Sequence, residues 1–372
     1  MMLHRAGGEV NAVNVAGQSA LMMAAARGHA EIVKSLLEMG AELKEDWNRG
    51  WNALMFAAQS GHDEVLKVIL SDDIGPDTPS KQGVTPLMVA AQYGRFECAI
   101  TLIDHRAKLN AQDDKGRTAL MKAALKGRAK ILKLLIVRGA NVHTVDQGGW
   151  DVLMYAAQSG HTSSVQLLLD KHASLETQSE KGSTCLSIAA SYGHLECVKK
   201  LVKRGAEIDT PTKGGLTPLM WATRKGFYDT VEFLVEEGAD LDAVDSGGFD
   251  MLMHAAQSGN ADIVQFLLDE AVNYDSRSRS GTSALCIAAK HGHCESVKRI
   301  VSRGAELDVQ DQHGVTPLMR AAKNGHFETV QVLVDNGANL NLKNKDGKAA
   351  IDVCPKYGET FVYDILKKAK AT

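Results

Sequence analysis

The sequence has few of the features that mark a secreted, membrane-bound or disulfide-stabilised protein. In 372 residues there are six scattered cysteines, and aromatic residues make up only 5%. Because so few cysteines cannot form a disulfide scaffold, we expect a reducing intracellular environment, cytoplasmic with the nucleus left open. The sequence contains no apolar run of about 18 residues, no hydrophobic signal core at its start and no Asn-x-Ser/Thr sequon, so we expect no membrane insertion.

Motifs for catalysis and for metal binding are also absent. There is no Gly-x-x-x-x-Gly-Lys-Ser/Thr phosphate loop, no Gly-x-Ser-x-Gly nucleophile turn, no His-Glu-x-x-His helix and no Cys-x-x-Cys pair. The densest group of metal-binding side chains, at 291–294, contains a Gly-His pair that recurs elsewhere at the same repeat position. We therefore expect no enzyme active site, no cofactor and no metal site.

The charge balance argues against nucleic-acid binding. The formal net charge is -3 and the pI is near 6.5, whereas a protein that binds a phosphate backbone usually carries a basic excess. One stretch, residues 115–133, is locally basic. A solvated basic face and a site for a nucleic acid or another acidic ligand are both open interpretations, and the lack of aromatic stacking partners favours the solvated face.

The sequence does contain a strict internal repeat. Glycine recurs at intervals of 33 residues from Gly17 to Gly347, and a second glycine follows each of these by eleven residues. Two residues after the first glycine there is Ser, Thr, Asn or Asp in every copy except the last, which has Ala349. Such side chains cap helices by accepting from free first-turn amides. Each unit is thus predicted to form a short alanine-rich helix, a glycine turn, a second apolar helix and a polar turn, the finger, that leads to the next first glycine.

These features resemble the ankyrin repeat over nearly the whole chain. Matching segments are Gly-Val-Thr-Pro-Leu at 83–87 and 314–318, Ala-Ala-Lys-Asn-Gly-His at 321–326 and Asn-Gly-Ala-Asn-Leu-Asn at 336–341. The resemblance implies an all-α ankyrin-repeat solenoid, with a helix-turn-helix and a β-turn or hairpin finger in each repeat. We expect the finger of a partial leading repeat at 1–16, ten repeats over 17–346 and a C-terminal capping repeat over 347–372.

One position departs from the family pattern. The resemblance implies histidine after Thr-Pro-Leu, but most repeats have methionine there: Met22, Met55, Met88, Met121, Met154, Met220, Met253 and Met319. We expect these side chains to form a continuous apolar seam, which is adaptable but specifies geometry less sharply.

The repeats also follow a three-repeat cycle. The segment 50–62 is echoed at 149–161 and at 248–260, 99 residues apart each time. The resemblance implies that ligands bind the fingers and the exposed side of the first helices, which here are positions one, six, nine and ten after the first glycine. The candidate partner-binding residues are Trp51, Phe56, Gln59, Tyr93, Lys126, Trp150, Tyr155, Gln158, Tyr192, Trp221, Arg224, Lys225, Phe249, His254 and Gln257. Block duplication explains the cycle by history alone, and a repeated set of pockets remains compatible with it.

The resemblance implies a non-enzymatic, monomeric scaffold or adaptor that holds an extended protein segment in a concave groove. Tryptophan is a frequent interface anchor, so Trp51 and Trp150 would hold the partner while Lys126, Arg224 and Lys225 pair with its acidic residues. The alternative for the tryptophans is packing against neighbouring fingers. The alternative for the chain is a regulatory arm of a larger enzyme or signalling protein whose catalytic domain lies outside it.

Overall fold

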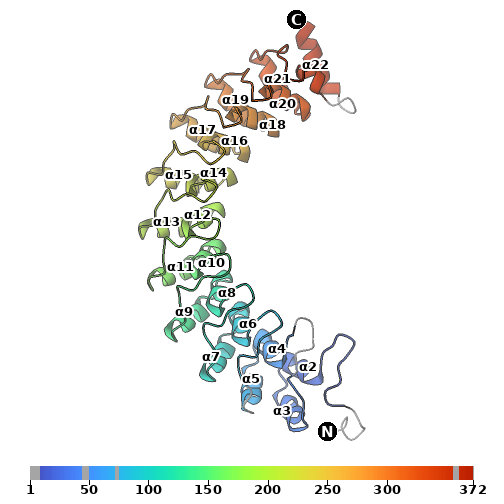
Figure 1. Cartoon of the computed structure of the whole chain (residues 1–372), viewed down its shortest axis with the longest axis vertical. Helices are drawn as coiled ribbons and strands as arrows, with labels where there is room; N and C mark the ends of the chain where they lie inside the picture. The colour runs from blue at the N-terminus through green and yellow to red at the C-terminus, as the bar shows by residue number, and fades with distance from the viewer. Residues whose placement is uncertain (1–8, 44–49, 72–74, 355–359, 372) are drawn as a thin grey trace. The chain divides into compact units, whose positions relative to one another are not determined.

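The computed structural model describes residues 9–43, 50–71, 75–354 and 360–371 (Figure 1). These residues form an all-helical repeat array in which a pair of helices is followed by a finger. The chain divides into two compact units, Met1–Glu180 with Lys203–Ala206, and Lys181–Val202 with Glu207–Thr372. The predicted fold class, stacked helix pairs of the ankyrin type, is confirmed.

In the first unit, each first helix packs against the next first helix along the chain, and each second helix packs against the next second helix. The first helices are α2 (Ala20–Arg27), α4 (Ala53–Ser60), α6 (Pro86–Tyr93), α8 (Ala119–Leu125) and α10 (Val152–Ser159). The second helices are α3 (Ala30–Glu38), α5 (Asp63–Leu70), α7 (Phe96–Asp104), α9 (Ala129–Val137) and α11 (Thr162–Leu169).

The second unit follows the same order. Its first helices are α12 (Cys185–Ser191), α14 (Pro218–Lys225), α16 (Met251–Ser258), α18 (Ala284–His291) and α20 (Pro317–Lys323). Its second helices are α13 (Leu195–Lys203), α15 (Tyr228–Glu236), α17 (Ala261–Asp269), α19 (Cys294–Ser302) and α21 (Phe327–Asp335). The last repeat contributes the 3-10 helix η1 (Ala350–Val353), which packs on α20, and α22 (Thr360–Ala371), which packs on α21.

The first helices begin where the capping pattern predicts. The side chain of Asp151 accepts from the N–H of Met154 at 2.8 Å, and Thr118 accepts from Met121 at 3.3 Å. The same bond is present at all ten predicted caps. In the last repeat Ala349 has no side-chain oxygen, and its N–H instead donates to the Asp352 carboxylate at 2.9 Å.

The core of each unit consists of the small and apolar residues of the first helices and the apolar stripe of the second helices. All eight methionines at the position after Thr-Pro-Leu are buried, so the predicted apolar seam is confirmed as a buried feature of both units. Pairs of alanines, such as Ala123 and Ala124, are fully buried and let adjacent first helices approach closely.

The fingers are stacked by backbone hydrogen bonds. Within one finger, the N–H of Gly149 donates to the carbonyl of Asp146 at 3.0 Å, and the N–H of Gln147 donates to Lys115 of the preceding finger, also at 3.0 Å. Gly116 has a φ of +78°, and a Cβ there would lie 2.9 Å from the Cα of Asp146. Glycine is therefore required both for the turn and for the close approach of the next finger. The finger-to-finger bond recurs in the second unit.

The residue that follows each second helix differs between repeats. Most repeats place a glycine there with positive φ, such as Gly238 at 86°. The described non-glycine residues with positive φ are the three that replace this glycine, Arg106, His172 and Ala271, at 66°, 56° and 57°. The fourth replacement, Asp73, lies outside the described residues. Left-handed backbone is disfavoured for residues with a Cβ, so these three positions carry local strain.

The leading fragment expected at 1–16 is described from residue 9 onward. Val13 forms an isolated antiparallel bridge with Ser19, which brings the finger back to the start of α2. The side chain of Asn11 accepts from the N–H of Glu42 at 2.9 Å, so this finger is connected to the end of the first repeat. Residues 1–8, with the Gly-Gly pair at 7–8, lie outside the described residues.

Candidate partner-binding face

The face formed by the fingers and the first helices carries the candidate residues. A finger residue that the sequence analysis did not identify bonds both to the finger backbone and to the first helix. This finger residue lies three positions before the first glycine of each repeat. One oxygen of the Asp146 carboxylate accepts from the backbone N–H groups of Gly148, at 2.8 Å, and Trp150, at 2.9 Å. It therefore fixes the turn that presents Trp150.

The second oxygen of the same carboxylate reaches position six on the first helix. Tyr155 donates its hydroxyl to Asp146 at 2.6 Å. Two other repeats repeat the arrangement with different donors, Lys122 to Asp113 at 2.8 Å and Arg320 to Asp311 at 2.5 Å. In a further repeat the His254 Nε2 lies 3.3 Å from the Asp245 carboxylate, without hydrogen-bond geometry. In these repeats the finger aspartate thus fixes the side chain at position six.

The sequence contains a signal for this pairing in the offset of nine residues. Where the finger residue is aspartate, position six carries a hydrogen-bond donor, as just described. Where the finger residue is serine or threonine, position six is apolar: Ser80 with Val89, Ser179 with Ile188, Thr212 with Trp221 and Ser278 with Ile287. A comparison of the repeats with one another at this offset would have found Asp113, Asp146, Asp245 and Asp311.

Positions one and six also meet through their rings. The ring centroids of Trp51 and Phe56 are 5.6 Å apart, and those of Trp150 and Tyr155 are 5.4 Å apart. Such spacings and tilted planes are favourable for aromatic pairs. Each finger tryptophan therefore packs on the first helix of its own repeat. The Trp150 ring also covers the finger glycine Gly148, whose Cβ would lie 3.5 Å from the indole.

The candidate residues fall into three classes of exposure. Phe56 and His254 are buried, at 7% and 1% exposed, and their rings pack against the finger aromatics Trp51 and Phe249. The half-buried candidates are Trp51, Gln59, Trp150, Tyr155, Gln158, Trp221, Phe249 and Gln257. The exposed candidates are Tyr93, Lys126, Tyr192, Arg224 and Lys225. Arg224 lies over the ring of Trp221, with its guanidinium carbon 5.9 Å from the centroid, which orients the cation on this face.

Asp113 is the finger residue that pairs with two cations. It accepts from Arg117 at 2.8 and 3.0 Å and from Lys122 at 2.8 Å. Burial acts to raise the pKa of Asp113, but the hydrogen bonds from Arg117 and Lys122 outweigh it and lower that pKa to about 2. Burial also lowers the pKa of Lys122, an effect that Asp113 partly offsets. At neutral pH the site is an ionised carboxylate between two cations.

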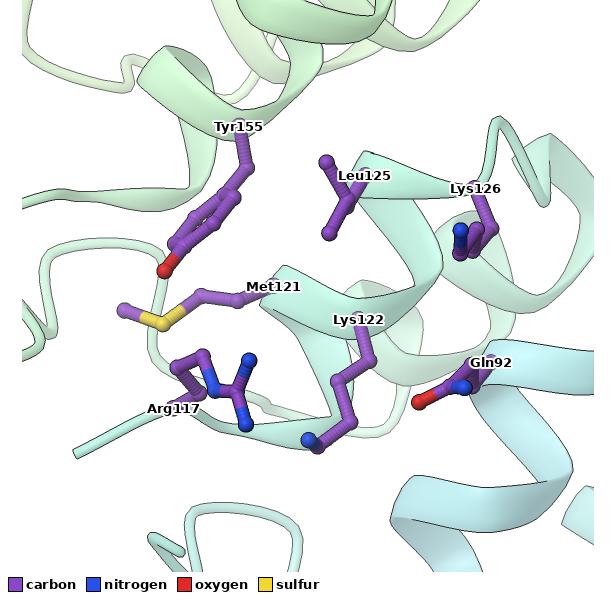
Figure 2. Close-up of a pocket in the computed structure, with 7 residues that line it drawn as sticks. All are labelled: Gln92, Arg117, Met121, Lys122, Leu125, Lys126 and Tyr155. Atoms are coloured by element: carbon purple, nitrogen blue, oxygen red, sulfur yellow. The ribbon is translucent and has the colours of Figure 1, made fainter. Parts of the chain in front are cut away.

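These residues border a small pocket between α6, α8 and α10 (Figure 2). Its volume is about 30 Å³, and it is lined by Gln92, Arg117, Met121, Lys122, Leu125, Lys126 and Tyr155. Figure 2 shows Tyr155, Leu125 and Lys126 along one side and Arg117, Lys122 and Gln92 along the other. The pocket therefore brings two candidate residues of adjacent repeats, Lys126 and Tyr155, to one place.

The described residues contain neither a metal-binding group of side chains nor a membrane-spanning helix. Among them, no three His, Cys, Asp or Glu side chains are grouped closely enough to hold a metal ion. No helix in the described part of the chain combines the length and the apolar character needed to cross a bilayer.

The ankyrin profile matches along nearly the whole sequence. A family profile described as "Ankyrin repeats (3 copies)" matches residues 1–80, 73–146, 120–212, 153–245, 186–279, 219–311, 252–344 and 285–371. The chain belongs to the ankyrin repeat family. Ankyrin repeat domains are in general protein-interaction modules, and chains that contain only such repeats are typically non-catalytic.

A solved structure supports the same assignment. The crystal structure of the human ASB11 ankyrin repeat domain is similar, with a TM-score of 0.55 and 27% sequence identity. The alignment covers 58% of this ankyrin chain and 96% of that one. No match was found among the curated proteins.

Proposed function

We propose that this ankyrin chain is a non-enzymatic scaffold or adaptor that binds an extended segment of a partner protein on the face of its fingers and first helices. The observation that carries the proposal is the paired arrangement at positions one and six. A half-exposed finger aromatic rests on a buried or hydrogen-bonded side chain of the first helix, as in Trp150 on Tyr155. A large apolar surface held in one orientation loses little conformational entropy on binding, which is what an interface anchor requires.

The polar groups around these aromatics fit a peptide backbone. Gln59, Gln158 and Gln257 occupy position nine in the three repeats with an aromatic finger, and each is half-buried. An amide side chain both donates and accepts, so it can bond to the main chain of an extended segment whatever the sequence of that segment. Exposed Lys126 and Arg224 would add pairing with acidic side chains.

The test uses peptides selected from a random phage-displayed library on the full chain. We expect Trp150→Ala to weaken binding of the selected peptides by about tenfold or more, because anchor truncation commonly costs 2 kcal/mol or more. The matched control is Val137→Ala, which truncates an exposed residue on α9 in the opposite helix row. Thermal melting of both variants should stay close to that of the parent. A fall in melting temperature for Trp150→Ala with unchanged affinity would mean that the tryptophan is structural and that the proposed face is wrong.

We also propose an intracellular, monomeric protein. Four of the six cysteines are buried as small core residues, which is compatible with a reducing compartment. Light scattering of the purified chain tests the monomeric state directly.

A further inference from the structure

The pocket between α6, α8 and α10 has more positive than negative charge around it. Arg117, Lys122 and Lys126 line it. The carboxylate that pairs with Arg117 and Lys122 is Asp113. Asp146 lies beside the pocket, but its two oxygens are occupied by finger amides and by the Tyr155 hydroxyl. Three cations therefore line the pocket beside two carboxylates.

Lys122 has donors to spare in a place that water reaches poorly. Its side chain is only 7% exposed, and the hydrogen bond described for its ammonium group goes to Asp113 at 2.8 Å. An ammonium group has three N–H donors, and a buried donor without an acceptor costs free energy. An additional oxygen in the pocket would satisfy such a donor and balance the surplus charge at the same time.

The side of the pocket across from Arg117 and Lys122 is mostly apolar, with Lys126 at its end. Met121, Leu125 and the ring of Tyr155 line it, and Figure 2 shows Leu125 between Tyr155 and Lys126. At about 30 Å³ the pocket admits a small polar group but not a ring. It is thus complementary to a carboxylate that is followed or preceded by an apolar side chain.

We propose that this pocket binds the carboxylate of an aspartate or glutamate in an extended partner segment, with a neighbouring apolar side chain of that segment packed on Leu125 and Tyr155. Lys126 and Lys122 donate to the carboxylate, and the tightly paired Arg117 and Asp113 hold Lys122 in place. The proposal rests on the proposed function and specifies the chemistry of the partner on that same face. It also assigns a role to the basic stretch 115–133, for which a merely solvated face was the favoured interpretation of the sequence.

The experiment selects peptides on the parent chain of 372 residues and measures their binding to three chains. These are the parent, Lys126→Glu, and the control Lys130→Glu, which makes the same charge change in the same repeat but at an exposed position of α9. We expect peptides selected on the parent to be enriched in Asp or Glu next to Leu, Ile, Val or Phe. We expect a selected peptide to bind Lys126→Glu about tenfold or more weakly, as for loss of a hydrogen bond to a charged group, and to bind Lys130→Glu within about twofold of the parent.

A double-mutant cycle separates a direct contact from a general field. Replacing the acidic peptide residue by its amide should weaken binding to the parent by a similar factor and should not weaken binding to Lys126→Glu, where it removes a like-charge repulsion. Peptides that depend on Trp150 but lack an acidic residue, or that lose affinity equally on both charge reversals, would overturn the carboxylate site and leave the proposed function standing. A library that yields no Trp150-dependent peptide would overturn both.

Discussion

At the scale of single residues, the finger residue and position six act as one unit. Sequence periodicity was sufficient to place position six on the first helix, because it recurs there every 33 residues. It could not show that Lys122 and Tyr155 turn back toward Asp113 and Asp146, since a contact nine residues apart depends on the path of the finger. For the same reason Phe56 and His254 were assigned to the partner, whereas their side chains are buried beneath the finger aromatics.

His254 gives this unit a dependence on pH. Burial is the main cause that lowers its pKa to about 4, and the nearby Arg224 acts in the same direction while Asp245 opposes both. Because the unfolded chain binds a proton near pH 6.5 and the folded chain does not, stability that is complete above that pH is lost as the pH falls toward 4.

We expect His254→Phe to flatten this part of the stability profile. The slope of the unfolding free energy between pH 6.5 and 4 should fall by up to roughly 1 kcal/mol per pH unit, measured by urea unfolding across that range. Phenylalanine suits the site because repeat two has Phe56 at the same position, under Trp51. Removal of an exposed imidazole by His313→Gln is the control. Equal slopes for the parent and His254→Phe would show that His254 does not take up a proton when the chain unfolds.

At the scale of helices and turns, local chemistry predicted most of what is observed. The capping residues and the glycine turns depend on interactions within a few residues, so they could be read from the sequence and are confirmed, as at Thr118 and Gly160. The finger stacking required long-range information. Its bonds join residues about one repeat apart, such as Gln147 with Lys115, and no local pattern predicts their geometry.

The strained ends of the second helices yield a prediction for stability. We expect Ala271→Gly to stabilise the chain by about 1 kcal/mol, because glycine adopts the φ of 57° without the steric cost that alanine has. Gly238→Ala should destabilise by a similar amount, since a Cβ there meets no atom within 4 Å and the backbone angle is the relevant cost. Urea midpoints of the two variants test this pair. Destabilisation by Ala271→Gly would show that the alanine side chain contributes packing that outweighs the strain.

At the scale of the whole molecule, the array is a sum of similar units with a variable face. Repeat proteins gain stability from each repeat and from its interface with the next, so the frame residues can stay constant while positions one, six, nine and ten change. The 99-residue cycle therefore presents aromatic, tyrosine and basic surfaces in turn on an unchanging support. The identity of the fold followed from the period, whereas the chemistry of the pocket at Lys122 required the structure.

Hydrogen–deuterium exchange of the full chain with and without a selected peptide tests the central claim most directly. If a partner segment binds the face of fingers and first helices, the peptide should slow exchange in the finger at 146–150 and in α8 and α10. Exchange in α9 and α11, the second helices of the same repeats, should be unchanged. Protection confined to α9 and α11, with the fingers unaffected, would contradict the account.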